Sequence, residues 1–177
     1  MSDTAPSPTN VLLPAARVAV FAQDADIRAI VQSLADDWRF ARVTFDIQEG
    51  NVDTATVFYQ SNTSPNLLIV ETEEIGGTFT EKLEVLASSC ADSTAAVVIG
   101  PVNDVYLYRK LIDMGVSDYL VRPLQKHVLT ELVAKILIEK LGTPGSRLLA
   151  FVGAKGGVGT SWMALMSSLF KFWAAPF

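Results

Sequence analysis

The sequence predicts an α/β fold, in which a doubly wound parallel sheet of five strands is followed by the first βα unit of a second domain. Apolar runs of strand length alternate with stretches of helical periodicity from residue 17 to about residue 140. The run at 66–71 is almost continuously apolar, as in a strand that is covered on both faces of a parallel sheet. A further apolar run at 148–152 leads into a glycine-rich turn, which marks the second unit.

The five strands are predicted at 17–22, 41–47, 66–71, 95–99 and 118–121, with a helix after each. Asp24 is the predicted N-cap of the first helix, and a short second helix is expected at 52–59. Apolar residues mark the third helix (Phe79, Leu83, Leu86), the fourth (Val105, Tyr108, Leu111, Ile112) and the fifth (Leu129, Leu132, Val133, Ile136, Leu137). Gly115 is expected to end the fourth helix.

Four segments follow from this pattern. Residues 1–10 are polar and proline-containing, residues 1–15 are predicted to be a flexible leader, and residues 16–140 are predicted to form the five-stranded domain. Gly, Pro, Gly and Ser within 141–146 predict a linker, after which 147–177 begin the second domain. The second segment offers one strand and one helix, so it is expected to be an incomplete domain that does not fold alone.

Composition narrows the classes of function. Of the 177 residues, 50% are apolar and 19% are charged, with a net charge of −5, so a globular core is expected and sequence-independent binding of nucleic acid is not. The single cysteine, Cys90, is expected to be a small residue of a helix or loop, and no Cys/His cluster predicts a metal site. We find no apolar stretch of membrane-spanning length and no secretory signal, which predicts a cytoplasmic protein.

The glycine-rich turn at 153–161 carries the most specific motif of the chain. Glycines let backbone N–H groups curl around phosphate oxygens, a following helix adds its dipole, and a Ser/Thr hydroxyl binds Mg²⁺. All these parts occur in order after the apolar run at 148–152. The predicted nucleotide-binding residues are Lys155, Gly156, Gly157, Val158, Gly159, Thr160 and Ser161. The alternative is a glycine turn that binds no ligand.

This turn resembles the deviant Walker A motif of the MinD/ParA ATPases, which implies that the second segment is the start of a P-loop ATPase domain. The resemblance implies ATP and Mg²⁺ as cofactors, Lys155 as the residue that reaches a dimer partner's nucleotide, and Ser161 as the magnesium ligand. Thr160 stands where the family has its second lysine, which removes positive charge from the phosphates. Only about 30 residues follow the linker, whereas the family's domain is far longer, so we expect a truncated chain with no catalytic residues and no ATPase activity.

The first domain resembles the receiver domains of response regulators, which share a flavodoxin-like fold. Residues 115–123 (GVSDYLVRP) follow the receiver pattern closely, with Arg122 at the position of its lysine. The other positions have changed: the acidic pair after strand one is Ala22-Gln23, the phosphoacceptor aspartate is Glu71, and the hydroxyl residue after strand four is Gly100. The resemblance therefore defines a degenerate phosphoacceptor pocket formed by Gln23, Asp24, Glu71, Gly100 and Arg122.

Two interpretations of Glu71 stay open at this point. It is either a solvated carboxylate at a strand end, which we favour, or a permanent imitation of a phosphorylated aspartate. Arg122 is expected to pair with Glu71 or with Asp24. The only histidine, His127, lies near the start of the last helix, where a surface or capping role is expected rather than a phosphorelay.

A degenerate receiver followed directly by a KGGVG loop resembles the CpaE/TadZ family of pilus-assembly proteins. The match runs from residue 16 to about residue 165, and its most telling segments are 98–104, 115–124 and 151–161. It implies a localisation and scaffold protein for tight-adherence (Flp) pili, placed at a cell pole, with pilus machinery proteins as partners and an ATPase-like part that forms a homodimer. The alternative is a two-component response regulator with an ATPase-like output domain. A third hypothesis, an active partitioning ATPase, is disfavoured by Thr160 and by the short second segment.

Overall fold

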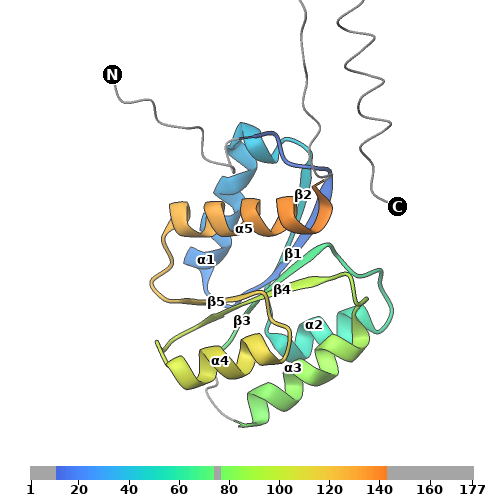
Figure 1. The fold of residues 1–177 in the computed structure, drawn as a ribbon, viewed down its shortest axis with the longest axis vertical. Coiled ribbons are helices and arrows are strands. Elements are labelled where there is room, and N and C mark those ends of the chain that lie inside the picture. The colour runs from blue at the N-terminus through green and yellow to red at the C-terminus, as the bar shows by residue number, and fades with distance from the viewer. Residues whose placement is uncertain (1–10, 74–76, 143–177) are drawn as a thin grey trace, which may run out of the picture. The chain divides into compact units, whose positions relative to one another are not determined.

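The sheet of the computed structural model, which describes residues 11–73 and 77–142, has five parallel strands in the order β2-β1-β3-β4-β5 (Figure 1). The strands are β1 Ala16–Phe21, β2 Val43–Gln48, β3 Leu67–Glu71, β4 Ala95–Gly100 and β5 Asp118–Val121. The order changes direction between β1 and β3, and doubly wound sheets bind ligands at that point, outside the carboxyl ends of the strands. The predicted doubly wound, five-stranded parallel sheet is confirmed.

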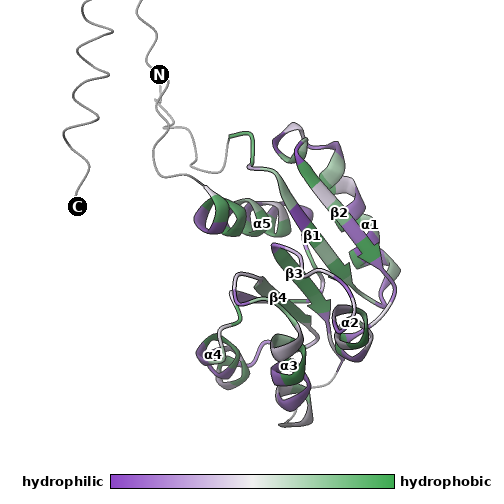
Figure 2. Cartoon of the chain, turned by 90° about the vertical axis from the view of Figure 1, so that its right-hand side faces the viewer, coloured by the Kyte–Doolittle hydropathy of each residue, from purple (hydrophilic) through white to green (hydrophobic). Residues whose placement is uncertain are grey.

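Helices cover both faces of this sheet (Figures 1 and 2). They are α1 Ala25–Gln32, α2 Val52–Tyr59, α3 Gly77–Ser89, α4 Val105–Asp113 and α5 Lys126–Leu141, with two short 3₁₀ helices, η1 Ser33–Asp36 and η2 Trp38–Phe40. On one face α1 and α5 pack on residues such as Val18, Leu67 and Val97. On the other face α2, α3 and α4 pack on the alternate residues, such as Ala19, Leu68 and Val98.

Short polar side chains and one glycine set the helix ends. The Asp24 carboxylate accepts a hydrogen bond from the N–H of Asp26 at 2.8 Å, so Asp24 is the N-cap of α1, as predicted. Asn51 and Thr54 form a reciprocal capping box at the start of α2, which explains how so short a helix forms. Gly115 has a φ of 92° directly after α4, a conformation that favours glycine, and the chain turns there into β5.

The apolar stripe predicted for α4 is partly wrong. Leu111 is buried as expected, but Val105, Tyr108 and Ile112 are 58%, 41% and 37% exposed. The second residue that packs on the sheet is Leu107, which is 9% exposed. The helix carries two apolar stripes, and the inward stripe is fixed by its contact with the sheet rather than by periodicity alone.

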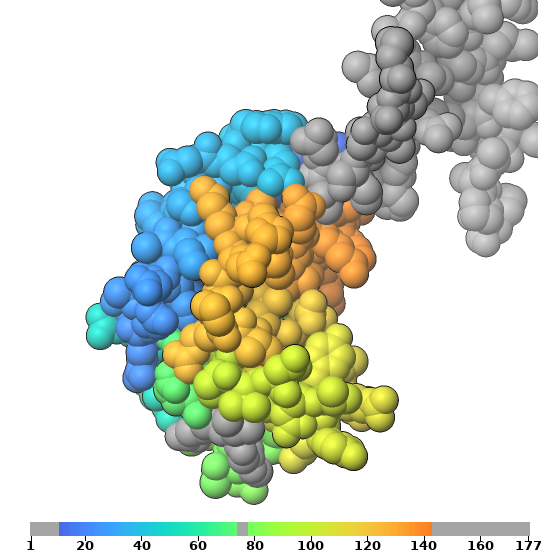
Figure 3. All heavy atoms as spheres, turned by 90° about the vertical axis from the view of Figure 1, so that its left-hand side faces the viewer, coloured from blue at the N-terminus to red at the C-terminus, as the bar shows by residue number. Residues whose placement is uncertain are grey.

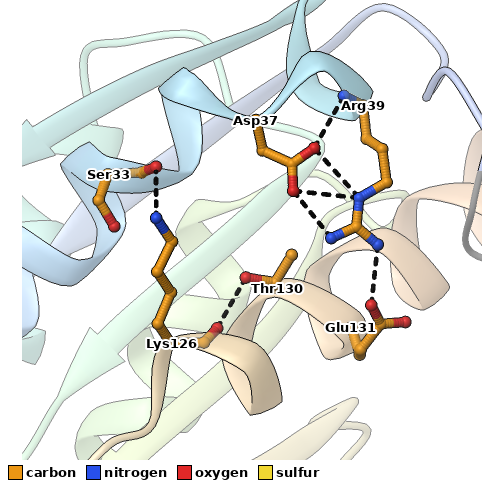
Figure 4. Close-up of polar contacts among 6 residues, drawn as sticks. All are labelled: Ser33, Asp37, Arg39, Lys126, Thr130 and Glu131. Atoms are coloured by element: carbon orange, nitrogen blue, oxygen red, sulfur yellow. Dashed lines mark hydrogen bonds and ion pairs between the residues drawn. The ribbon is translucent and has the colours of Figure 1, made fainter.

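The segment between α1 and β2 is tied to α5 by charged side chains (Figure 4). The Arg39 guanidinium donates to the Asp37 carboxylate, with a shortest distance of 2.8 Å, and to Oε1 of Glu131 at 2.8 Å. The hydrogen bonds from Arg39 hold the pKa of Asp37 below its usual range. Leu13, which the sequence analysis assigns to the leader, is buried, and its N–H donates to the Arg39 carbonyl at 2.9 Å. Packing therefore begins before residue 16.

Two single residues behave as the sequence indicates. Cys90 is a free, half-buried thiol beside the core of the α2–α3–α4 face, and burial raises its pKa. His127 is exposed at the start of α5. Among the helices of residues 11–73 and 77–142, none has the length and apolar character needed to cross a lipid bilayer. The linker beyond Gly142 and the predicted nucleotide loop lie outside the described residues.

Candidate functional site

The carboxylate of Glu71 is the centre of the candidate site, at the carboxyl edge of the sheet. Glu71 is the last residue of β3 and is only 3% exposed. Its Oε2 accepts hydrogen bonds from the N–H groups of Gln23 at 2.7 Å and Asp24 at 2.8 Å, in the loop between β1 and α1. Its Oε1 accepts a hydrogen bond from the Arg122 guanidinium at 3.0 Å. The expectation of a solvated carboxylate is therefore wrong.

Arg122 joins the ends of three strands. Its own N–H donates to the Gly100 carbonyl at 3.0 Å, which fixes the backbone after β5 against the end of β4. Its Nη1 pairs with Glu71 and also with Oε1 of Glu73, at 2.6 Å. The hydrogen bond from Arg122 lowers the pKa of Glu73, and the Glu73 hydrogen bond raises the pKa of Arg122. Of the two pairings expected for Arg122, the structure shows the one with Glu71.

Arg28 holds the loop between β1 and α1 that carries the two N–H donors. Its Nη1 donates to the carbonyls of Ala22 at 2.7 Å and Gln23 at 2.8 Å. Asp24 uses its carboxylate as the cap of α1, so it points its N–H, not its side chain, at Glu71. Figure 3 is turned so that this edge faces the viewer, and the start of α1, the β5–α5 segment and α4 gather around it.

Tyr119 occupies the space beside Gly100, where the receiver pattern has a hydroxyl side chain. A Cβ added to Gly100 would lie 2.8 Å from both Cε2 and Cζ of the Tyr119 ring, and closer still to its hydroxyl oxygen. The Tyr119 hydroxyl donates to the Val102 carbonyl at 2.8 Å, which anchors the loop between β4 and α4. The glycine is thus complementary to an aromatic ring, and the proton of the Tyr119 hydroxyl is donated to the Val102 carbonyl.

A cavity of about 140 Å³ opens beside the carboxylate, between β3 and the starts of α2 and α3. Glu71, Glu73 and Asp53 bring carboxylates to its lining, and the single ammonium, from Lys82, pairs with Asp53 at 3.1 Å. The residues present do not fit a divalent cation, because the Arg122 guanidinium already pairs with the carboxylates of Glu71 and Glu73 and the Asp24 carboxylate caps a helix. Among the described residues, no group of three or more His, Cys, Asp or Glu side chains is arranged to hold a metal ion.

Solved structures of pilus assembly proteins share this fold and much of this sequence. A CpaE2 pilus assembly protein from Sinorhizobium meliloti 1021 is 42% identical, with a TM-score of 0.66, and the match covers 68% of this chain and 98% of that chain. This chain belongs to the CpaE family of pilus assembly proteins. The pilus assembly protein CpaE from Caulobacter crescentus CB15 is 30% identical, with a TM-score of 0.68 over 72% of this chain and 97% of that chain.

Receiver domains resemble this CpaE-family domain in fold alone. The signal receiver domain of a Luxo repressor protein from Vibrio parahaemolyticus is 18% identical, with a TM-score of 0.58 over 72% of this chain and 93% of that chain. No family model matches the chain. No match was found among the curated proteins.

The structure brings together four of the five residues predicted for the degenerate phosphoacceptor pocket, and the fifth, Gly100, contacts Arg122 through its carbonyl group. Gln23 and Asp24 contribute backbone N–H groups rather than side chains. Three further residues of this site were not predicted from the sequence: Arg28, Glu73 and Tyr119. The aromatic residue three positions before Arg122, read together with Gly100, was the available signal for Tyr119.

Proposed function

We propose that this chain is a scaffold and localisation module for pilus assembly, and that its receiver-like domain works without phosphorylation. The observation that carries the proposal is the buried carboxylate of Glu71, which accepts hydrogen bonds from two backbone N–H groups and one guanidinium within 3.0 Å. Membership of the CpaE family supports the pilus role.

Phosphorylation of a carboxylate requires an oxygen that is free to attack phosphorus and cations that stabilise the charge on the transferred group. In this pocket Oε2 already accepts two hydrogen bonds, Oε1 is paired with the Arg122 guanidinium, and Ala22 and Gln23 provide no carboxylate for Mg²⁺. The same contacts support the hypothesis that Glu71 holds the domain permanently in one state, because its negative charge already attracts Arg122 as an added anion would.

The proposal is tested by incubating the full chain with acetyl phosphate and Mg²⁺ and measuring intact mass. We expect no added phosphoryl group, either in the natural chain or in Glu71→Asp, which restores the acceptor but not the missing acidic pair. An active receiver domain is the positive control. A stoichiometric phosphoryl group that disappears in Glu71→Ala would refute the proposal and favour the response-regulator alternative.

The part of the proposal that concerns nucleotide binding rests on the sequence motif of residues 155–161. We propose that this loop binds ATP·Mg²⁺ weakly and that the chain does not hydrolyse ATP, because Thr160 replaces the lysine that would neutralise the phosphates. Calorimetric titration with ATP·Mg²⁺ and a phosphate-release assay test this, with Lys155→Ala as the matched control. Turnover that is abolished in that control would contradict it.

The proposal also includes three properties of the chain: it has pilus machinery proteins as partners, it forms a homodimer, and it lies at a cell pole. A fluorescent fusion in cells that assemble pili should form a polar focus. Sedimentation of the purified chain with and without ATP should show whether nucleotide drives the monomer to a dimer. Uniform fluorescence would remove the polar role, and a mass independent of nucleotide would remove the dimer switch.

A further inference from the structure

A second cavity, of about 200 Å³, lies at the opposite edge of the sheet from Glu71. It opens where α3 and α4 end, and it reaches inward to Leu68 and Val70 of β3. Leu83 and Leu86 of α3 form its inner wall, whereas Ala87 and Gly115 lie at its exposed mouth. No residue of the candidate functional site lines this cavity.

The size and lining of this cavity fit one apolar side chain. Apolar cavities of about 150 Å³ bind a molecule the size of benzene, whereas most small-molecule sites exceed about 300 Å³. Protein interfaces commonly bury a single aromatic or aliphatic anchor in a pocket of this kind. The occupant that matches the volume is therefore one side chain of a partner protein rather than a metabolite.

The mouth of the cavity selects the charge of that partner. The charged residues of its lining are Glu84 and Asp92, and both are exposed carboxylates. The helix α3 ends beside them at Ser89 with no basic residue in its last turn, so its carbonyl end adds negative potential. Lys110 of α4 directs its ammonium to the Thr80 hydroxyl, 3.0 Å away, and does not line the cavity.

We propose that this cavity is a docking site for a protein segment in which one apolar anchor residue is flanked by Lys or Arg. The anchor fills the space above Leu68 and Val70, and its cationic neighbours pair with Glu84 and Asp92. The cavity shares no residue with the Glu71 pocket. A negative result in the docking test therefore leaves the proposed function standing, and a negative result for the proposed function leaves the docking site standing.

Three peptides test the docking site: acetyl-Lys-Phe-Lys-amide, acetyl-Glu-Phe-Glu-amide and acetyl-Lys-Ala-Lys-amide. Each is titrated into the full chain while the backbone amide signals of Cys90, Gly115 and Val116 are followed by NMR. We expect saturable shifts with the first peptide, about tenfold weaker binding with the second because two exposed charge pairs become repulsive, and no saturable shift with the third.

Variants then locate the binding. Ala87→Phe places a ring in the mouth from an exposed helix position and should abolish the shifts, whereas Val85→Phe, on the same helix but outside the lining, should not. Glu84→Lys should weaken the first peptide about tenfold and strengthen the second. Equal binding of the three peptides, no binding of the first, or binding unaffected by Ala87→Phe and Glu84→Lys would overturn the proposal.

Discussion

Replacing Gly100 by alanine tests whether Tyr119 has taken the place of a side chain at that position. The added methyl group would lie 2.8 Å from two ring carbons of Tyr119, which is well inside van der Waals contact. Tyr119 is 7% exposed and anchored to the Val102 carbonyl, so the ring must move and lose its hydrogen bond. Overpacking destabilises the folded state by about 1–3 kcal/mol, and loss of the hydrogen bond destabilises it by about 1 kcal/mol. Alanine also lowers the conformational entropy of the unfolded chain, which stabilises the protein by about 0.4–1 kcal/mol. We expect a net loss of about 1–3 kcal/mol in the free energy of unfolding.

Urea unfolding of the full chain gives this value, and a double-mutant cycle assigns it. In a Tyr119→Ala background the methyl group has room, so the cost of Gly100→Ala should fall close to zero and the coupling energy should reach about 1–3 kcal/mol. Gly115→Ala is the matched control, because its added Cβ has no neighbour within 4 Å and its cost comes from a φ of 92° instead. If Gly100→Ala costs the same with and without the tyrosine ring, Tyr119 does not fill this space and the reasoning is refuted.

Three further predictions concern polar groups that are buried or partly buried. The Tyr59 hydroxyl is buried with no hydrogen-bond partner among the described residues, and burial raises the pKa of Tyr59 to about 12. Tyr59→Phe should therefore leave the free energy of unfolding unchanged or raise it by up to about 1 kcal/mol in the same urea assay. Tyr119→Phe, which removes a hydrogen bond, should lower it by about 1 kcal/mol. A loss of stability in both variants would contradict this prediction. Glu71→Ala leaves the N–H groups of Gln23 and Asp24 without their acceptor and Arg122 with only its exposed partner Glu73, so it should cost about 3 kcal/mol. Glu73→Ala removes only the exposed partner and should change little. Equal costs of the two variants by thermal or urea unfolding would argue against a buried charge at residue 71. Because Arg39 lowers the pKa of Asp37 in the folded state, this pair stabilises the fold above about pH 5 and the contribution is lost as the pH falls below about pH 4. Asp37→Asn should flatten that acid limb, and unfolding curves of identical pH dependence in the two proteins would exclude it.

Local signals predict most of the fold, because the elements are set by patterns within one stretch of chain. The helix α2 is confirmed at its predicted bounds, and its start depends on two residues three positions apart. Periodicity was insufficient for α4, where two apolar stripes compete and only packing on the sheet selects Leu107 over Val105. A helix with apolar residues on two sides cannot be oriented from its own sequence.

The candidate site was predicted as a set of positions but not as a set of contacts. The receiver pattern places Glu71, Arg122 and the loop after β1 at one edge, and the structure confirms that they meet. That Glu71 reaches the N–H groups of Gln23 and Asp24 depends on backbone geometry 48 and 47 residues away in sequence. Contacts of that range have no periodic signature, so the carboxylate's burial could be found only in three dimensions.

The fit between Gly100 and Tyr119 constrains how this domain can change during evolution. Restoring a hydroxyl residue at position 100 collides with the ring unless residue 119 becomes smaller first, and a smaller residue there leaves a cavity and an unpaired Val102 carbonyl. Shortening Glu71 to aspartate abandons two N–H donors and the guanidinium before any acidic pair exists to bind Mg²⁺. Each single step toward phosphate acceptance thus passes through a less stable protein. The packing around these side chains therefore couples residues 71, 100 and 119, so the cost of a substitution at any one of them depends on the residues at the other two.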